Sequence, residues 1–297
     1  MLYNGSVVGM TKSSNSKKMS RPVVGRVSLI AALFGFCLFV VTGLCLVISL
    51  LAPDPELTPY IISEEQYSVD AAELDTVGEF ADRIELDVRE QGLVGIEVPI
   101  LIDEYVRNKF HHEYSTIPWY DNWVLAVTDL AIPQYLLSGN MKPVDIVRYD
   151  YGICNQQAIL FQELVKEFGY DYGSVRFQAP DFGHFASAVR VNGDWYFFDP
   201  NLEPEYDRTD PDVFRQIDLG NKQVLTRMYG DHFENITEDM IELSEINTFP
   251  ASNGVLAQEL TFVLSWYGWM LILLPSAAAM FRQGRLQRRC RDSSSSF

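Results

Sequence analysis

Three residues able to act together in chemistry follow one another along the chain, namely Cys154, His184 and Asp199. A thiol, an imidazole and a carboxylate can serve as a nucleophile, a base and a group that orients the base. Each stands in a distinctive local sequence, since Gly152 comes two residues before the cysteine and Pro200 follows the aspartate. Their order and spacing predict a catalytic site built from these three side chains.

Cys154 opens an amphipathic segment, residues 154–168, which predicts a helix that stops at Gly169. The unpaired amides and the positive end of the dipole at a helix start stabilise a thiolate. Gly152 lets the chain turn tightly before the helix and lets a substrate backbone approach. We therefore expect the thiol in the first turn of a helix.

Three predicted strands follow this helix, at residues 174–179, 185–191 and 195–198. The last two flank Asn192-Gly193, which is the strongest short signal for a hairpin with a two-residue turn. The order of elements is therefore a helix followed by an antiparallel hairpin.

The hairpin turn also sets which residues face one another. A two-residue turn places Val191 opposite Asp194 and, continued along both strands, Ala186 opposite Asp199. His184 shares a face with Ala186, so it is a diagonal neighbour of Asp199, with about 7–8 Å between the backbones. The register alone thus predicts a side-chain hydrogen bond between the imidazole and the carboxylate.

At these positions the chain resembles the transglutaminase-like superfamily, a branch of the papain-like cysteine enzymes. The matching residues, within residues 143–204, are Gly152-Ile-Cys154, His184 and Trp195-Tyr-Phe-Phe-Asp199-Pro200. The resemblance implies an α+β fold in which the helix carrying the cysteine packs on an antiparallel sheet. It also implies a Cys-His-Asp triad that attacks a carboxamide or peptide carbonyl of a protein or peptide substrate. A thioester intermediate would then lead to acyl transfer, deamidation or hydrolysis.

Two positions depart from the family pattern, although neither removes a catalytic group. Many members have an aromatic residue where this chain has Ala186, and many have an arginine or another polar residue where it has Tyr151. Both positions concern the substrate groove. The oxyanion donors are expected to include the Cys154 amide, and the candidate side-chain donors are aromatic residues that are more often found in cores: Trp119, Tyr120, Trp123, Tyr149 and Tyr151.

Other interpretations of Cys154 stay open. Free cysteines are commonly buried for structural reasons, and a catalytically inactive transglutaminase-like module could bind an envelope protein or polymer as a scaffold. The intact set of three groups favours the enzyme. No fourth ligand and no paired CxxC accompany Cys154, so we expect no metal and no other cofactor.

Two uncharged, almost wholly apolar segments, residues 28–52 and 260–281, are long enough to cross a bilayer as helices. A cleaved signal peptide is the alternative for the first. Its apolar region exceeds the usual length of about 7–15 residues, and Leu50-Leu51-Ala52 lacks the small-x-small cleavage pattern. The sequence therefore predicts a two-pass membrane protein.

Basic residues flank both spans on the sides that face the chain ends, which predicts cytoplasmic termini and an extracytoplasmic main domain in the cell membrane. We divide the chain into a basic tail (1–27), a span (28–52), a linker and helical part (53–142), a transglutaminase-like core with an acidic C-terminal part (143–259), a span (260–281) and a basic tail (282–297). The flanking basic residues are Lys12, Lys17, Lys18, Arg21, Arg26, Arg282, Arg285, Arg288, Arg289 and Arg291.

The part between the spans is strongly acidic. Of 23 basic and 40 acidic residues, ten basic residues and one acidic residue lie in the tails, which leaves a net charge of −26 between the spans. Such a field disfavours nucleic acid and favours cationic partners or solubility. Cys37 and Cys45 lie in the first span and Cys290 in the second tail, so Cys154 has no disulfide partner in its own compartment.

The remaining helical signals are less sharp. Apolar spacing predicts helices at residues 64–91, 99–110, and 122–137 with an interruption at Pro133, and further helices near 211–218 and 238–245. His111 and His112 fall in a polar stretch where we expect them to be solvated.

Overall fold

The computed structural model describes residues 21–53, 68–132, 137–178, 183–201, 222–230, 233 and 235–294. It divides into two compact units, one made of Met1–Leu44 with Trp266–Phe297 and the other of Cys45–Ser265. Each unit is described by itself.

The first unit consists of parts of two long helices, α1 (Arg21–Leu51) and α10 (Ser252–Ser294). Both are long and apolar enough to cross a membrane, over Arg26–Leu51 and Ser252–Arg288. The rings of Phe39 and Trp269 meet edge to face with 4.9 Å between their centroids. A Cβ on Gly35 would lie 3.0 Å from the main chain of Leu273, so this glycine permits the helices to approach closely.

The second unit contains an antiparallel sheet with strand order β3-β2-β1-β4. Its strands are β1 (Asp171–Gln178), β2 (Gly183–Val191), β3 (Asp194–Phe198) and β4 (Ile241–Leu243). The first three confirm the predicted strands. Val191 faces Asp194 across the predicted turn, where Asn192 and Gly193 have positive φ angles of 53° and 96°. Those angles are what a two-residue hairpin turn that matches the strand twist requires.

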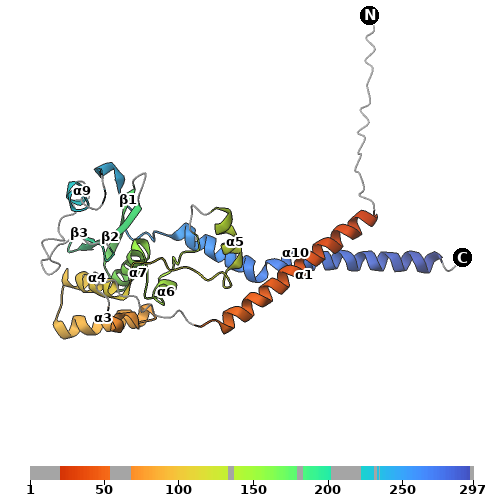
Figure 1. Ribbon diagram of the computed structural model, residues 1–297, viewed down its shortest axis with the longest axis horizontal. Helices are drawn as coiled ribbons and strands as arrows, with labels where there is room; N and C mark the ends of the chain where they lie inside the picture. Colours follow the sequence, from red (N-terminus) through yellow and green to blue (C-terminus); the bar gives the residue numbers. More distant parts are fainter. Residues whose placement is uncertain are drawn as a thin grey trace, which may run out of the picture. The chain divides into compact units, whose positions relative to one another are not determined.

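Helices cover one face of this sheet (Figure 1), and α7 (Cys154–Glu167) packs directly on β1 and β2. Gln162 on this helix donates to the hydroxyls of Ser174 and Ser187. Outside α7 lie α4 (Glu97–Lys109) and α3 (Val77–Gln91), and α6 (Pro143–Ile146) packs at its side. The α+β class with a cysteine-bearing helix on an antiparallel sheet is confirmed.

A second, smaller core fills the other face of the sheet. It joins Phe177, Ala188 and Phe197 from the strands to Tyr229, which follows α9 (Gln223–Met228). Sheet residues alternate between the two cores along each strand.

The predicted helix at 64–91 differs from the structure, which has α2 (Val69–Ala72) and α3 with a break between them. The break occurs because Thr76 caps α3: its hydroxyl accepts from Glu79 N, and the Glu79 carboxylate accepts from Thr76 N, each at 3.1 Å. This capping box restarts the helix. Gly92, in the left-handed conformation with a φ of 69°, ends it at the predicted residue.

The predicted helix at 238–245 is wrong. A 3₁₀ turn, Glu238–Met240, leads instead into β4, where Ile241 pairs with Phe177 and is fully buried. Burial against the second core overrides the local helical pattern. The predicted helix at 211–218 and the interruption at Pro133 lie outside the described residues.

The other two predicted helices are present, the first with its ends shifted and the second shortened. The helix predicted at 99–110 is α4, and the helix predicted at 122–137 is α5 (Trp123–Ala131), with the Asn122 side chain accepting from Leu125 N at 3.2 Å as its cap. In Figure 1, α5 lies beside the first turns of α10.

Candidate active site

Cys154 is the first residue of α7, as expected, and its side chain is partly exposed. The carboxamide of Gln156, two residues into the helix, holds the chain around this start. It accepts from Ile153 N at 3.3 Å and Ser115 N at 3.1 Å, and it donates to Ser115 O at 2.7 Å and Asn140 O at 3.1 Å. The main-chain amides of Gln156 and Gln157 donate back to Ile153 O at 2.9 and 3.0 Å, which closes the first turn of the helix.

The loop before the cysteine is fixed by main-chain bonds. Gly152 donates to His111 O at 2.9 Å, and its carbonyl accepts from the Gln157 side chain at 2.7 Å. A Cβ on Gly152 would lie 3.3 Å from the Phe110 ring, which explains why the smallest residue stands here. His111 is only 3% exposed and pairs with Tyr151, so the expectation that it is solvated is wrong. The helix ends at Lys109, and the next residues turn inward to this loop.

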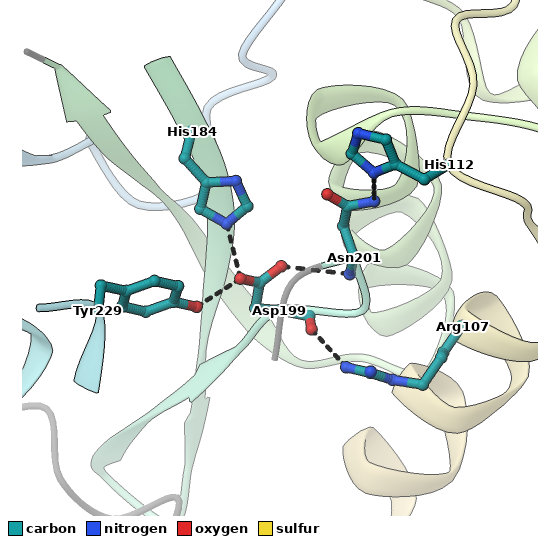
Figure 2. Close-up of polar contacts among 6 residues, drawn as sticks. All are labelled: Arg107, His112, His184, Asp199, Asn201 and Tyr229. Atoms are coloured by element: carbon teal, nitrogen blue, oxygen red, sulfur yellow. Dashed lines mark hydrogen bonds and ion pairs between the residues drawn. The ribbon is translucent and has the colours of Figure 1, made fainter. Parts of the chain in front are cut away.

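His184 and Asp199 meet as the hairpin register predicts. Nε2 of His184 lies 2.6 Å from Oδ2 of Asp199 (Figure 2), and both residues are buried. The strand ladder ends where Ser187 faces Phe198, so the bond lies just beyond the last paired residues of β2 and β3. The register set by the turn at positions 192 and 193 is thus consistent with the position of the two groups.

The imidazole also interacts with the thiol. Burial lowers the pKa of His184, but the charge and hydrogen bond of Asp199, together with a hydrogen bond and charge interaction with Cys154, raise this pKa to about 10. The ring is therefore protonated at neutral pH. It lies between the Asp199 carboxylate, which is bonded to one ring nitrogen, and the Cys154 thiol. All three residues singled out from the sequence are brought together.

The Asp199 carboxylate has two further partners. Tyr229, which is fully buried, donates its hydroxyl to Oδ2, and Asn201 N donates to Oδ1 at 3.2 Å (Figure 2). The main-chain oxygen of Asp199 accepts from the Arg107 guanidinium at 2.7 Å. These contacts fix the carboxylate from several elements, and a fixed carboxylate in turn fixes the imidazole.

The charges around this carboxylate shift one another. Burial, followed by the negative charge of Asp199, raises the pKa of the Tyr229 phenol well above its usual value. Burial lowers the pKa of Arg107 to about 10, against the attraction of Asp199, so the guanidinium stays charged at neutral pH. The phenol therefore remains a donor, and the buried carboxylate has a permanent cation nearby.

Aromatic rings enclose the imidazole on its far side. The centroids of Phe177, Tyr229 and Phe233 each lie 5.6 Å from that of His184. Tyr229, Phe233 and Arg107 were not anticipated from the sequence, because Arg107 sits in an ordinary helical pattern and the two aromatics follow a segment without periodicity. These residues are identified by their positions next to His184 or Asp199 in the folded chain.

Two of the aromatic candidates for an oxyanion donor are bonded elsewhere. The Trp123 indole donates to Ser265 O at 3.0 Å, and the Tyr149 hydroxyl donates to Thr116 O at 3.3 Å. Tyr151 stays nearest in sequence to the thiol, at the edge of the Tyr149 ring with 5.2 Å between centroids. Within the described ranges, no three His, Cys, Asp or Glu side chains gather in a way that could hold a metal ion.

Comparison with known proteins identifies a family for this part of the chain. A family model described as "Transglutaminase-like domain" matches residues 91–211, which include Cys154, His184 and Asp199. Neither the curated proteins nor the solved structures give a significant match. The matched range spans α4, α7 and the β2–β3 hairpin. Residues 91–211 of this chain are therefore a transglutaminase-like domain.

Proposed function

We propose that this protein is a membrane-anchored transglutaminase-like cysteine enzyme that acts on a carboxamide or peptide bond outside the cytoplasm. The observation that carries the proposal is the buried 2.6 Å bond between His184 and Asp199, with Cys154 at the start of α7 interacting with the same imidazole. A nucleophile, a base and an orienting group in this relation are what thiol-dependent acyl transfer needs.

In the first half of the proposed reaction, the Cys154 thiolate attacks the substrate carbonyl carbon. In this proposal the Cys154 amide, at the start of α7, stabilises the oxyanion that forms. The His184 imidazolium gives its proton to the leaving nitrogen, the carbon–nitrogen bond breaks, and ammonia or an amine departs from a thioester on the sulfur. Asp199 holds the ring and its charge throughout.

In the second half, the neutral imidazole takes a proton from the incoming nucleophile, which attacks the thioester carbonyl and releases the thiolate. Water gives deamidation or hydrolysis, and an amine gives acyl transfer. The substrate class is a protein or peptide, and the membrane anchors favour one associated with the cell envelope.

The proposed location follows from the two apolar helices and the basic residues beyond them. With both spans inserted and both basic ends in the cytoplasm, the transglutaminase-like domain lies on the outer side. A membrane-impermeant maleimide applied to intact cells checks this, with native cysteines replaced by serine. A cysteine at the exposed Arg89 should be labelled and one at Arg285 should not; the reverse pattern contradicts the topology.

The chemistry can be tested without knowing the substrate. With Cys37, Cys45 and Cys290 replaced by serine, the rate of alkylation by iodoacetamide reports Cys154 alone. We expect substantial reaction below about pH 7, and a rate about tenfold or more lower there after His184→Ala. Lys166→Ala, on the exposed side of α7, is the matched control and should leave the rate unchanged.

A different result would sink the enzyme. If Cys154 reacts only above about pH 8, as an ordinary thiol does, and His184→Ala leaves the profile unchanged, the three groups do not act together. The domain would then be a catalytically inactive binding module.

A further inference from the structure

Helix α5 carries an exposed apolar face in an almost uncharged stretch of chain. Between residues 122 and 141, Asp129 is the sole charged residue. The side chains of Val127 and Leu130 lie on one side of the helix, and the residues are 57% and 84% exposed. Two large apolar side chains exposed together on one side of a short helix point to an interaction surface rather than a face made for water.

The polar side chains of Thr128 and Asp129 on α5 are bonded within the segment. The Asp129 carboxylate accepts from Leu137 N at 2.9 Å and Ser138 N at 2.7 Å. The Thr128 hydroxyl donates to Val124 O at 2.8 Å. A segment that leaves water must satisfy its polar groups internally, and these groups are already satisfied.

Contacts with α10 set the depth of α5 along that helix. Val124 N donates to the Ser265 hydroxyl, and the Trp123 indole donates to Ser265 O, both at 3.0 Å. Ser265 lies five residues into the apolar run that starts at residue 260, which is about 8 Å along the helix axis. Helices that lie in a membrane surface are buried by about 5–10 Å, so the depth agrees.

The other span reaches the same segment. The Ser49 hydroxyl, near the end of α1, donates to the Asp121 carboxylate at 2.6 Å. Trp119 is 55% exposed just before this point, and its ring meets Tyr120 edge to face at 5.7 Å. Exposed aromatic residues are typical of the membrane–water boundary. The outer ends of both apolar helices therefore meet the chain where α5 begins.

We propose that α5 lies in the outer surface of the membrane that α1 and α10 cross, with Val127 and Leu130 in the lipid. The occupant of the apolar face is thus the bilayer, and the inference rests on the proposed membrane anchoring.

This placement deepens the proposed function because the segment carrying α5 joins the active-site loop. Its two ends meet where Ile117 N donates to Ser138 O and Asn140 N donates to Ser115 O. Gln156, two residues after Cys154, bonds the main chain of both Ser115 and Asn140. The thiol is thereby held at a fixed offset from the membrane surface, which selects substrate segments that lie next to the bilayer.

Nitroxide labels on the full chain in phospholipid nanodiscs test the placement. In a cysteine-free background, single cysteines replace Leu130, the exposed Arg89 on α3, and the exposed Leu271 in the apolar run of α10. Collision with oxygen reports lipid, and collision with a water-soluble nickel chelate reports water. We expect labels at 130 and 271 to be reached by oxygen and protected from nickel, and the label at 89 to show the reverse.

Two outcomes overturn the inference in distinguishable ways. If the label at 271 is in lipid while that at 130 behaves like that at 89, the anchoring stands and α5 is a water-facing helix. If the label at 271 is also exposed to nickel, α10 does not span the bilayer, and the proposed anchoring fails together with the inference.

Discussion

His184 and Asp199 form a 2.6 Å bond between side chains that are only 4% and 0% exposed. An imidazolium and a carboxylate shielded from water in this way depend strongly on one another, because neither has solvent to replace its partner. The energetic consequences for folding can be measured independently of any substrate.

The first prediction concerns stability as a function of pH. The folded-state pKa of His184 is raised from 6.5 to about 10, so its stabilising contribution is complete below pH 6.5 and is lost as the pH rises toward 10. We expect Asp199→Asn to lower the free energy of unfolding at both pH values. The decrease should be about 1.5–3 kcal/mol larger near pH 6 than near pH 10. Urea denaturation at both pH values measures it.

Asp171→Asn provides the control, since Asp171 is paired with the exposed Arg190 and not with a histidine. Its effect should not change between the two pH values. An equal pH trend in both variants would mean that the His184 pair is not the cause.

The second prediction concerns Tyr229, whose hydroxyl shares the Asp199 oxygen that holds His184. Tyr229→Phe removes a donor that takes up part of the carboxylate charge, so we expect the pKa of His184 to rise further. The loss of stability should be about 0.5–1.5 kcal/mol. Histidine-ring NMR across pH measures the pKa, helped by a total of four histidines.

The matched variant is Tyr170→Phe, which removes a hydroxyl bonded at 2.9 Å to Gly95 O, away from the carboxylate. It should cost similar stability and leave the His184 titration in place. A titration that Tyr229→Phe leaves unmoved would assign that phenol to packing alone.

The third prediction separates two buried glutamines on α7. Gln156→Leu removes the bonds to Ser115 and Asn140 and leaves buried main-chain groups unpaired, so a loss of about 2–4 kcal/mol is expected together with slower alkylation of Cys154. Gln162→Leu removes bonds to two serine hydroxyls farther along the helix. It should reduce stability while Cys154 keeps its reactivity; equal loss of reactivity in both would point to general unfolding.

The fourth prediction concerns the buried Lys109, which donates to the carbonyls of Ala72 and Leu74 at 2.9 Å each. Burial lowers its pKa from 10.5 to about 8, against the attraction of nearby acids. The folded chain therefore binds fewer protons than the unfolded chain between these values, and stability from this group rises with pH. Between pH 8 and 10.5, the free energy of unfolding of the wild type should increase by on the order of 2 kcal/mol relative to that of Lys109→Met. The same comparison made with Lys166→Met is the control. An increase relative to Lys109→Met that is no larger than the increase relative to Lys166→Met would contradict the prediction.

The hairpin and the cysteine helix could be predicted because their signals are local. Asn192-Gly193 requires backbone angles that few other pairs adopt, and the resulting register places His184 near Asp199 without further information. The start of α7 at Cys154 and the end of α3 before Gly92 were set in the same way, by residues next to the boundary.

The remainder of the site depends on distant contacts. Tyr229 reaches Asp199 from 30 residues away and Arg107 from 92 residues away, and no local pattern encodes either distance. Ile241 became a strand residue because the second core buries it. His111 was expected in water and is instead packed beside the loop of Gly152. In each case packing between remote segments decides the outcome.

The narrow base of the segment that carries α5 has a consequence for how such chains can change over time. Ile117 and Ser138 are hydrogen-bonded neighbours, as Thr116 and Gly139 are across an antiparallel bridge. Two positions fixed side by side can be joined by short or long connections at little difference in closure entropy. Insertions or deletions between them would therefore leave the path leading to Cys154 in place, so that the proposed membrane contact and the proposed thiol chemistry could change separately over time.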